Sequence, residues 1–334
     1  MAEPQWTLPA ASYGGAERYE AERSKIFSNS WLLLGHLDDV TSHGDRFVLT
    51  MAGFSLMVVR DQEGVLRGFH NVCPHRAGPL GSEGRSSAPS IVCRYHGWSF
   101  DLSGTLTAAR DFGEPGPPPE VCRLSTFHVE IWRNLIFGHL GAEAPPLLDD
   151  LGTFAAEADG HPLEALHPAG SFSHEIACNW KVYAENYLEG YHLPLVHPGL
   201  TREVRPSQYR IEVGDRWCRH EVPTRRGAVN AGRWLWRWPN LALNLYPDSM
   251  NIEQFVPLSA ARTLVTYRYF TNDGVLDPAV VDMSRTILEE DAIICEAVQR
   301  NLDAGIYRQG VLSPKHEGAV GAFQRLVAQH LGEG

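Results

Sequence analysis

The stretch Cys73-Pro-His75 is followed, at Cys93-Arg-Tyr-His96, by a second cysteine–histidine pair. Each pair places its cysteine and histidine so close in sequence that one tight loop can present both to a metal. Two thiolates and two imidazoles in this order suit a [2Fe–2S] cluster in which the cysteines hold one iron and the histidines the other. Zinc sites normally use C-x2-4-C or H-x3-5-H spacing, which the first pair does not match. The pattern therefore predicts a [2Fe–2S] cluster; a zinc site or two unrelated pairs are the alternatives.

A second candidate metal site lies within residues 179–197. Apolar residues recur there at helical spacing, which predicts a half-buried helix that ends at Leu193, because the proline that follows disfavours a helical residue before it. Glu189 and His192 are three residues apart and therefore adjacent on the helix surface. Since the chain turns after the helix, His197 can return beside His192. Two imidazoles near a helix break, with a carboxylate one turn earlier, indicate a mononuclear iron site.

Such a site normally has two histidines and one carboxylate on one face of Fe(II), which leaves positions open for oxygen and substrate. The segment 282–302 is predicted to be a helix, and Asp291 falls inside its apolar stripe. That stripe consists of Met283, Ile287, Ile294 and Val298. A carboxylate on a buried face is costly unless it is paired or bound to a metal. Asp291 is therefore the predicted third iron ligand, and an ion pair with Arg268 or Arg300 is the alternative.

These motifs resemble the large (α) subunits of Rieske non-haem iron oxygenases, the ring-hydroxylating oxygenase group, over nearly the whole chain. The resemblance rests on Asn71-Val-Cys-Pro-His-Arg76, Cys93-Arg-Tyr-His-Gly-Trp98, Phe100-Asp-Leu-Ser-Gly104, Asn179-Trp-Lys181, Glu185-Asn186, Glu189-Gly-Tyr-His192, His197, and Asp291 with Glu296-Ala-Val-Gln-Arg300. Each motif alone would be much less specific than the set.

The resemblance implies a homotrimer in which the cluster of one subunit lies beside the mononuclear iron of its neighbour. The family's bridging carboxylate lies three residues before the first iron-ligating histidine, which here is Glu189. Many ring dioxygenases carry Asp at this position, whereas Glu resembles the branch that includes carnitine, glycine betaine and stachydrine oxygenases. Asn186 is a candidate to orient an iron ligand or iron-bound oxygen, and an ordinary helix residue is the alternative.

The chain carries no glycine-rich flavin or nicotinamide fingerprint, so a separate NAD(P)H-dependent reductase, with or without a ferredoxin, is expected to supply electrons. The expected reaction is O2-dependent hydroxylation or oxidative demethylation of a small molecule, with an N-methylated ammonium compound as the first candidate. Hydroxylation of an aromatic or alicyclic ring carbon is the second candidate. An electron-transfer or ligand-binding protein without oxygenase activity is the alternative from another class.

Composition agrees with a globular enzyme. The chain has 334 residues, 43% of them hydrophobic and 21% charged, and its net charge of −11 argues against nucleic acid as a partner. The sequence contains no run of 18 apolar residues, so no membrane-spanning helix is predicted. Six cysteines in a chain of this length do not indicate a disulfide framework. The cluster loops lack the extra cysteine that each loop of respiratory-type Rieske proteins carries, so the resemblance implies an oxygenase of the reducing cytoplasm.

The expected fold class is α+β, in two domains. Strand-like runs separated by turns predict an all-β cluster domain over residues 41–145, and residues 1–40 are expected to pack on the second domain. Alternating strands and a long late helix in residues 146–334 match the family's helix-grip catalytic domain, an antiparallel sheet with helices. Three indoles at Trp234, Trp236 and Trp238 are either a wall for a cationic methylammonium group or core and interface residues, of which the second is preferred.

Overall fold

The computed structural model describes residues 4–118, 122–205, 208–221 and 232–333. By its internal contacts the chain divides into two compact units, one formed by residues 28–150 and the other by residues 1–27 together with 151–334. The sequence placed these boundaries at residues 40/41 and 145/146, so residues 28–40, which were expected to pack on the second unit, group with the first.

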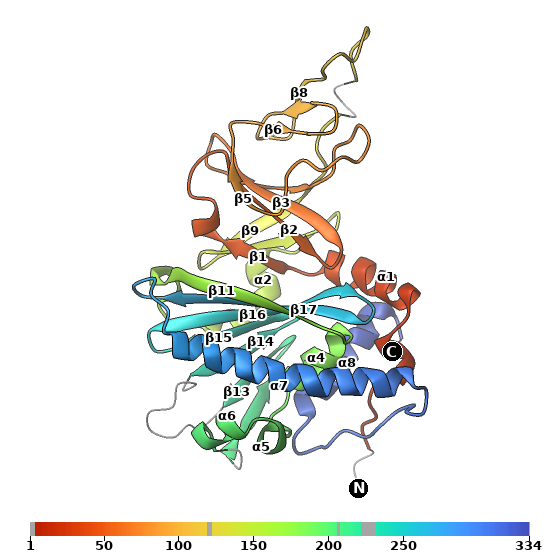
Figure 1. Ribbon diagram of the computed structural model, residues 1–334, viewed down its shortest axis with the longest axis vertical. Coiled ribbons are helices and arrows are strands. Elements are labelled where there is room, and N and C mark those ends of the chain that lie inside the picture. Colours follow the sequence, from red (N-terminus) through yellow and green to blue (C-terminus); the bar gives the residue numbers. More distant parts are fainter. Residues whose placement is uncertain (1–3, 119–121, 206–207, 222–231, 334) are drawn as a thin grey trace. The chain divides into compact units, whose positions relative to one another are not determined.

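The first unit is built from two antiparallel sheets (Figure 1). A seven-stranded sheet has the order β1-β10-β9-β4-β3-β2-β5, and a three-stranded sheet has the order β6-β7-β8. The strands of the larger sheet are β1 (Leu32–His36), β2 (Asp45–Met51), β3 (Phe54–Arg60), β4 (Leu66–His70), β5 (Gly84–Ser87), β9 (Thr126–Trp132) and β10 (Leu135–His139). Those of the smaller sheet are β6 (Ile91–Val92), β7 (Ser99–Phe100) and β8 (Leu106–Ala108). The helix α2 (Leu147–Leu151) follows at the end of the unit.

The second unit contains a seven-stranded antiparallel sheet with the order β11-β17-β16-β15-β14-β13-β12. Its strands are β11 (His167–Ile176), β12 (Arg210–Val213), β13 (Trp217–Glu221), β14 (Arg233–Arg237), β15 (Leu241–Tyr246), β16 (Ser249–Ser259) and β17 (Arg262–Thr271). Its helices are α1 (Ala16–Lys25), α3 (Phe154–Glu157), α4 (Trp180–Tyr187), α5 (Leu193–Val196), α6 (Pro198–Glu203), α7 (Pro278–Asp303) and α8 (Gly318–Leu331). The helix α4 packs against α7 and against strands β16 and β17. An all-β first unit and a second unit of antiparallel sheet with helices confirm the expected α+β class.

A buried ion pair joins the N-terminal helix α1 to α4. Lys181 and Glu22 are both fully buried, and the Lys181 ammonium donates to Glu22 Oε1. The other Glu22 oxygen accepts from the Trp180 indole N–H at 2.8 Å. Both charges are therefore satisfied inside the unit, which makes α1 part of its core.

In the part of the chain that the structure describes, no helix is both long and apolar enough to cross a membrane.

Candidate metal centres

The two predicted cluster loops have the same backbone arrangement. Cys73 lies in the loop after β4, where its N–H donates to Gly78 O at 2.8 Å, and Cys93 lies after β6, where its N–H donates to Trp98 O at 2.8 Å. Each loop thus closes on itself just beyond its cysteine–histidine pair. Both cysteines are only 2% exposed and belong to the same apolar cluster. Two short loops from different sheets therefore present four candidate ligands together.

The side chains of these loops suit a bound cluster. The His75 and His96 rings lie with their centroids 4.6 Å apart. His75 Nδ1 is buried and has no hydrogen-bond partner among the described residues, which leaves this nitrogen available to a metal. A Cβ added at Gly78 would lie 3.0 Å from Cys93 Sγ, so this position has room only for glycine beside the thiolate. Because buried polar atoms are normally satisfied, the orphaned imidazole nitrogen points to a missing iron partner.

The second candidate centre begins where α4 ends. The sequence predicted that this helix continues to Leu193, but it stops at Tyr187, and that prediction is wrong. The Glu189 carboxylate accepts hydrogen bonds from the backbone N–H groups of Tyr191 and His192, at 3.2 Å for His192. In a continued helix these N–H groups would donate to carbonyls four residues earlier, so the side chain replaces the helical bonds.

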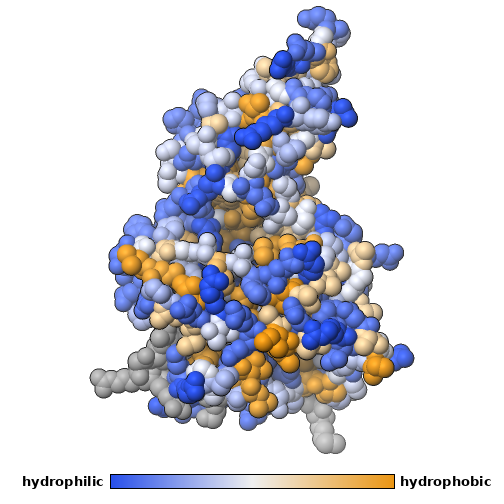
Figure 2. All heavy atoms as spheres, in the orientation of Figure 1, coloured by the Kyte–Doolittle hydropathy of each residue, from blue (hydrophilic) through white to orange (hydrophobic). Residues whose placement is uncertain are grey.

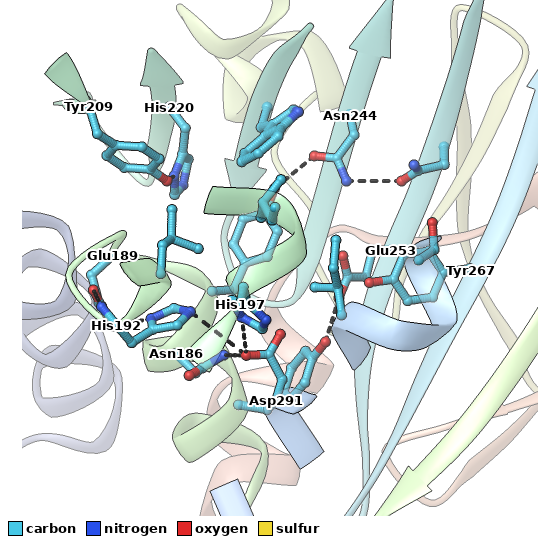
Figure 3. Close-up of a pocket in the computed structure, with 18 of the residues that line it drawn as sticks. Asn186, Glu189, His192, His197, Tyr209, His220, Asn244, Glu253, Tyr267 and Asp291 are labelled. Atoms are coloured by element: carbon cyan, nitrogen blue, oxygen red, sulfur yellow. Dashed lines mark hydrogen bonds and ion pairs between the residues drawn. The ribbon is translucent and has the colours of Figure 1, made fainter. Parts of the chain in front are cut away.

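His192, His197 and Asp291 meet at one point, although they come from a turn, a helix junction and α7 (Figure 3). One ligand atom from each lies within 4.8 Å of the others. Asp291 Oδ1 is 2.9 Å from His197 Nε2 and 3.7 Å from His192 Nε2. Two imidazole nitrogens and one carboxylate oxygen on one side of a cavity match the donor set of non-haem Fe(II) enzymes.

A second group orients each of these three side chains. His192 Nδ1–H donates to Glu189 Oε1 at 2.5 Å, and His197 Nδ1–H donates to Glu290 Oε2 at 2.7 Å. With Nδ1 donating in this way, Nε2 of each ring faces Asp291 and can bind a metal when it carries no proton, as is usual for metal-ligating histidines. Burial lowers the pKa of His197, but the hydrogen bonds and charges of Asp291 and Glu290 outweigh it, so the pKa is raised.

Asn186 holds the third side chain. Its amide donates to Asp291 Oδ1 at 2.7 Å, so Asp291 contacts two imidazoles and an amide. This environment suits a metal ligand better than an acid paired to an arginine. The sequence suggested Glu290 only as an alternative ligand to Asp291, its neighbour on α7, and not as the group that orients His197.

The predicted buried stripe of α7 differs from the observed one. Ile294 and Val298 are 39% and 40% exposed, whereas Asp291 is only 7% exposed. The buried residues of the helix are Leu288, Asp291, Ala292, Cys295 and Gln299. The helix therefore faces the sheet with a smaller and more polar surface than the apolar stripe suggested, and Asp291 lies on that surface.

The three candidate ligands open onto a cavity of about 100 Å³. Aromatic rings from α4 and from several strands line it: Tyr183, Tyr187, Tyr209, Trp234, Tyr246 and Tyr267. Leu193, Leu200 and Ile287 add an apolar side. Of the three predicted indoles, Trp234 lines the cavity, whereas Trp236 and Trp238 are buried against Phe323 with ring centroids 5.7 and 5.8 Å away.

Sequence reasoning did not find Glu253, which also lines this cavity. It lies on β16, and the Tyr183 hydroxyl donates to its Oε1 at 2.7 Å. The available signal was the alternation of Asn251 and Glu253 with Ile252, which places the two polar side chains on one face of the strand.

Comparisons with known proteins match both units. The profile of the Rieske [2Fe-2S] domain matches residues 30–126, and that of the ring hydroxylating alpha subunit (catalytic domain) matches residues 163–221 and 210–333. The carnitine monooxygenase oxygenase subunit of Acinetobacter pittii is 30% identical to this chain, over 97% of this chain and 95% of the relative. The chloroplastic choline monooxygenase of Atriplex hortensis is 28% identical, over 92% of this chain and 74% of the relative.

Solved structures agree with these relatives. A crystal structure of the quaternary ammonium Rieske monooxygenase CntA in complex with an inhibitor has a TM-score of 0.90 and 29% identity, covering 98% of this chain and 96% of that one. Naphthalene 1,2-dioxygenase with bound indole has a TM-score of 0.80 at 20% identity, covering 99% of this chain and 93% of that one, which shows a shared fold. The chain therefore belongs to the Rieske non-haem iron oxygenase α subunits, enzymes that bind a [2Fe–2S] cluster and a mononuclear iron and use O2 with electrons from a separate reductase.

Proposed function

We propose that this oxygenase hydroxylates a carbon of a small quaternary ammonium compound. In that reaction one oxygen atom of O2 enters a C–H bond and the other leaves as water, which consumes two electrons and two protons. His192, His197 and Asp291 hold the mononuclear iron, and Cys73, His75, Cys93 and His96 hold the cluster. When bound, the cluster supplies single electrons and the iron supplies the site at which O2 reacts.

The cavity beside the three candidate iron ligands is the observation that carries this proposal. It measures about 100 Å³. A quaternary ammonium group cannot donate a hydrogen bond, and aromatic faces are the surfaces that attract it. Six aromatic rings around a small space fit such a cation, and the relatives named above act on carnitine and choline.

Glu189 is proposed to couple the two metal sites. Its Oε1 accepts from His192, and the side chain is 12% exposed. Glu189 also borders a second hollow of about 400 Å³, which Asn186, Ile294 and Val298 line as well. A partner that covers this hollow would therefore come within reach of the carboxylate.

We propose that this partner is the cluster-binding unit of a second copy, in a homotrimer. The exposed apolar side chains of α7 include Ile293, at 71% exposure, beside Ile294 and Val298. Figure 2 shows hydrophobic residues at the surface of the face along which α7 runs in Figure 1. Exposed apolar groups of this kind mark interaction surfaces. The solved structure of a related quaternary ammonium monooxygenase is described in terms of inter-subunit electron transfer.

We propose the cytoplasm as the location of the enzyme. The six cysteines form no disulfide, and all are buried. Buried free thiols and an external reductase both suit a reducing compartment.

The test is substrate-dependent oxygen uptake by the purified protein, loaded with cluster and iron and driven by a surrogate reductase. The substrates are choline, L-carnitine, glycine betaine, benzoate and anisole. Oxygen uptake with stoichiometric hydroxylated product should occur with at least one of the three ammonium compounds. Turnover of benzoate or anisole alone would overturn the proposal in favour of ring or ether oxidation.

A further inference from the structure

We infer that the Glu253 carboxylate is the counter-charge for the ammonium group of the substrate, and that the rest of the substrate carries no carboxylate. This inference rests on the proposed function and narrows it to cationic ammonium compounds whose other polar group is uncharged, such as an alcohol.

The position of Glu253 follows from the sheet. Glu253 on β16 lies opposite Tyr267 on β17, and its side chain reaches the cavity on the face toward α4 (Figure 3). The Tyr183 hydroxyl donates to Oε1 at 2.7 Å, and the Tyr267 hydroxyl also donates to the carboxylate. A carboxylate has about four acceptor positions, so two tyrosine bonds orient Glu253 without using its full capacity.

The charge of Glu253 is poorly compensated within the protein. The residue is 3% exposed. Burial raises the pKa of Glu253 to about 7. The nearby charge of Asp291 also raises this pKa, whereas the hydrogen bonds from the two tyrosines lower it. None of the described residues that line the cavity is lysine or arginine. Since a buried carboxylate is costly without a cationic partner, a ligand that brings a positive charge here gains the interaction that the protein lacks.

The same charge distribution disfavours a carboxylate on the substrate. Besides Glu253, the described lining includes Glu189 and Asp291, which are also acidic. His220, a further lining residue, is neutral at physiological pH because burial lowers its pKa to about 3. With Asp291 bound to the iron, a zwitterionic betaine would still place its carboxylate near Glu253 and Glu189, with no lysine or arginine in the described lining to receive it. Like charges repel strongly in a site of low dielectric constant.

An uncharged polar group has suitable partners in the cavity. Asn244 and Asn251 line it, on neighbouring strands β15 and β16. The Tyr187 hydroxyl donates to Asn244 Oδ1 at 2.8 Å, and Asn244 Nδ2 donates to Asn251 Oδ1 at 2.9 Å. Amides and hydroxyls both donate and accept, so this group of side chains can bind a substrate hydroxyl without bringing any charge.

The experiment measures the equilibrium binding of four probes to the iron-loaded holoenzyme under anaerobic conditions, by calorimetry. Choline carries the cation and a hydroxyl, 3,3-dimethylbutan-1-ol is its uncharged carbon isostere, and glycine betaine and L-carnitine add a carboxylate. Choline should bind roughly 10- to 100-fold more tightly than the isostere, as expected for an ammonium and a carboxylate that interact in a site of intermediate dielectric constant. It should also bind at least about tenfold more tightly than either carboxylated compound, since each of those places a like charge beside the acidic lining.

Variants assign this preference to one side chain. Glu253→Gln should reduce the ratio of choline to isostere affinity to near one, and Glu253→Asp, which keeps the charge, should retain a measurable preference. Glu185→Gln is the matched control, because Glu185 is another carboxylate whose pKa burial raises and that does not line the cavity, and it should leave the ratio unchanged. The visible absorption of the cluster reports whether each variant is folded.

The possible failures are distinguishable. If no ammonium compound binds and only benzoate or anisole is turned over, the proposed function fails and this inference fails with it. If L-carnitine or glycine betaine binds more tightly than choline, or if wild-type protein binds choline and its isostere equally, the inference fails and the proposed function stands. The wild-type comparison decides even where a Glu253 variant does not fold.

Discussion

Asn186 donates a 2.7 Å hydrogen bond to Oδ1 of Asp291, the same oxygen that lies 2.9 Å from Nε2 of His197. This bond links α4 to α7 at the candidate iron site and fixes the direction in which the carboxylate points. A ligand held in place before the metal arrives loses less conformational entropy on binding, so Asn186 acts on the iron through Asp291.

Replacing Asn186 with Leu keeps the approximate volume and removes the donor. We expect the affinity for mononuclear Fe(II) to fall roughly 10- to 100-fold, the usual effect of losing a group that orients a metal ligand. Competition with a calibrated chelator measures the affinity, and the cluster absorption of the same sample serves as the control. An unchanged affinity would show that Asn186 is an ordinary helix residue.

Asp291→Ala should remove the mononuclear iron altogether. The iron content should fall by about one atom per chain while the visible absorption of the cluster persists, because the cluster ligands lie in the other unit. Glu290→Gln is the matched comparison: it weakens the support of His197 but leaves all three candidate ligands, so most of the iron should remain. Iron retention in Asp291→Ala would assign the ligand role to another acid.

Glu189→Gln should leave both metal centres filled and slow electron transfer between them severely. The amide can still accept from His192, but it has no charge with which to couple the two centres. Re-oxidation of the pre-reduced cluster after mixing with O2 and substrate measures this step in a single turnover. Normal turnover by the variant would contradict the bridging role.

The half-buried acid Glu185 should make stability depend on pH. Burial raises the pKa of Glu185 to about 7, against the hydrogen bonds from Tyr13 and Gln324. Between pH 4.5 and 7 the folded state then binds more protons than the unfolded state, so this group costs stability as pH rises, by up to roughly 3 kcal/mol. Glu185→Gln removes that loss. The apparent Tm of the variant should therefore rise relative to wild type between pH 5 and pH 8; a constant difference would refute the raised pKa.

Lys181→Met should destabilise the catalytic unit by about 3–5 kcal/mol, because it leaves the buried Glu22 charge with only the more distant Arg18, at 3.9 Å, as a cationic partner. The double change with Glu22→Gln should recover much of this loss, since no buried charge remains. Denaturant unfolding of the single and double variants measures the difference, and equal destabilisation by both would mean that the ion pair is not the cause.

The sequence was most informative where ligands are close in the chain. The cluster loops could be predicted because each holds its cysteine and histidine within a few residues, a spacing that few other sites share. The sequence linked His192 to Asp291 only because a non-haem iron site is expected to have two histidines and one carboxylate. The 98 residues between them carry no local signal that the two side chains are close in space. The early end of α4 could not be predicted from the spacing of apolar residues. It depends on the Glu189 carboxylate, which accepts hydrogen bonds from the backbone N–H groups of Tyr191 and His192.

The substrate cavity was the least predictable part. Its sheet side is assembled from residues of β13, β14, β15, β16 and β17, whose register is set by cross-strand pairing. A strand pattern indicates which residues share a face, but not which helix covers that face. The sequence therefore did not distinguish Glu253 from the other polar residues of β16, whereas the structure shows the Tyr183 hydroxyl of α4 donating to it. For the same reason, the alternation of Trp234, Trp236 and Trp238 could not show that only the first reaches the cavity.

The division of the chain has a consequence for its synthesis. The cluster-binding unit, residues 28–150, interrupts the unit to which α1 belongs. On the ribosome this inserted module is complete before α4 has been translated, and domains generally fold as they emerge. The cluster-binding unit can thus acquire iron and sulfide before Lys181 has been synthesised. During that time α1 has left the exit tunnel, but Glu22 still lacks the lysine with which it pairs in the folded unit.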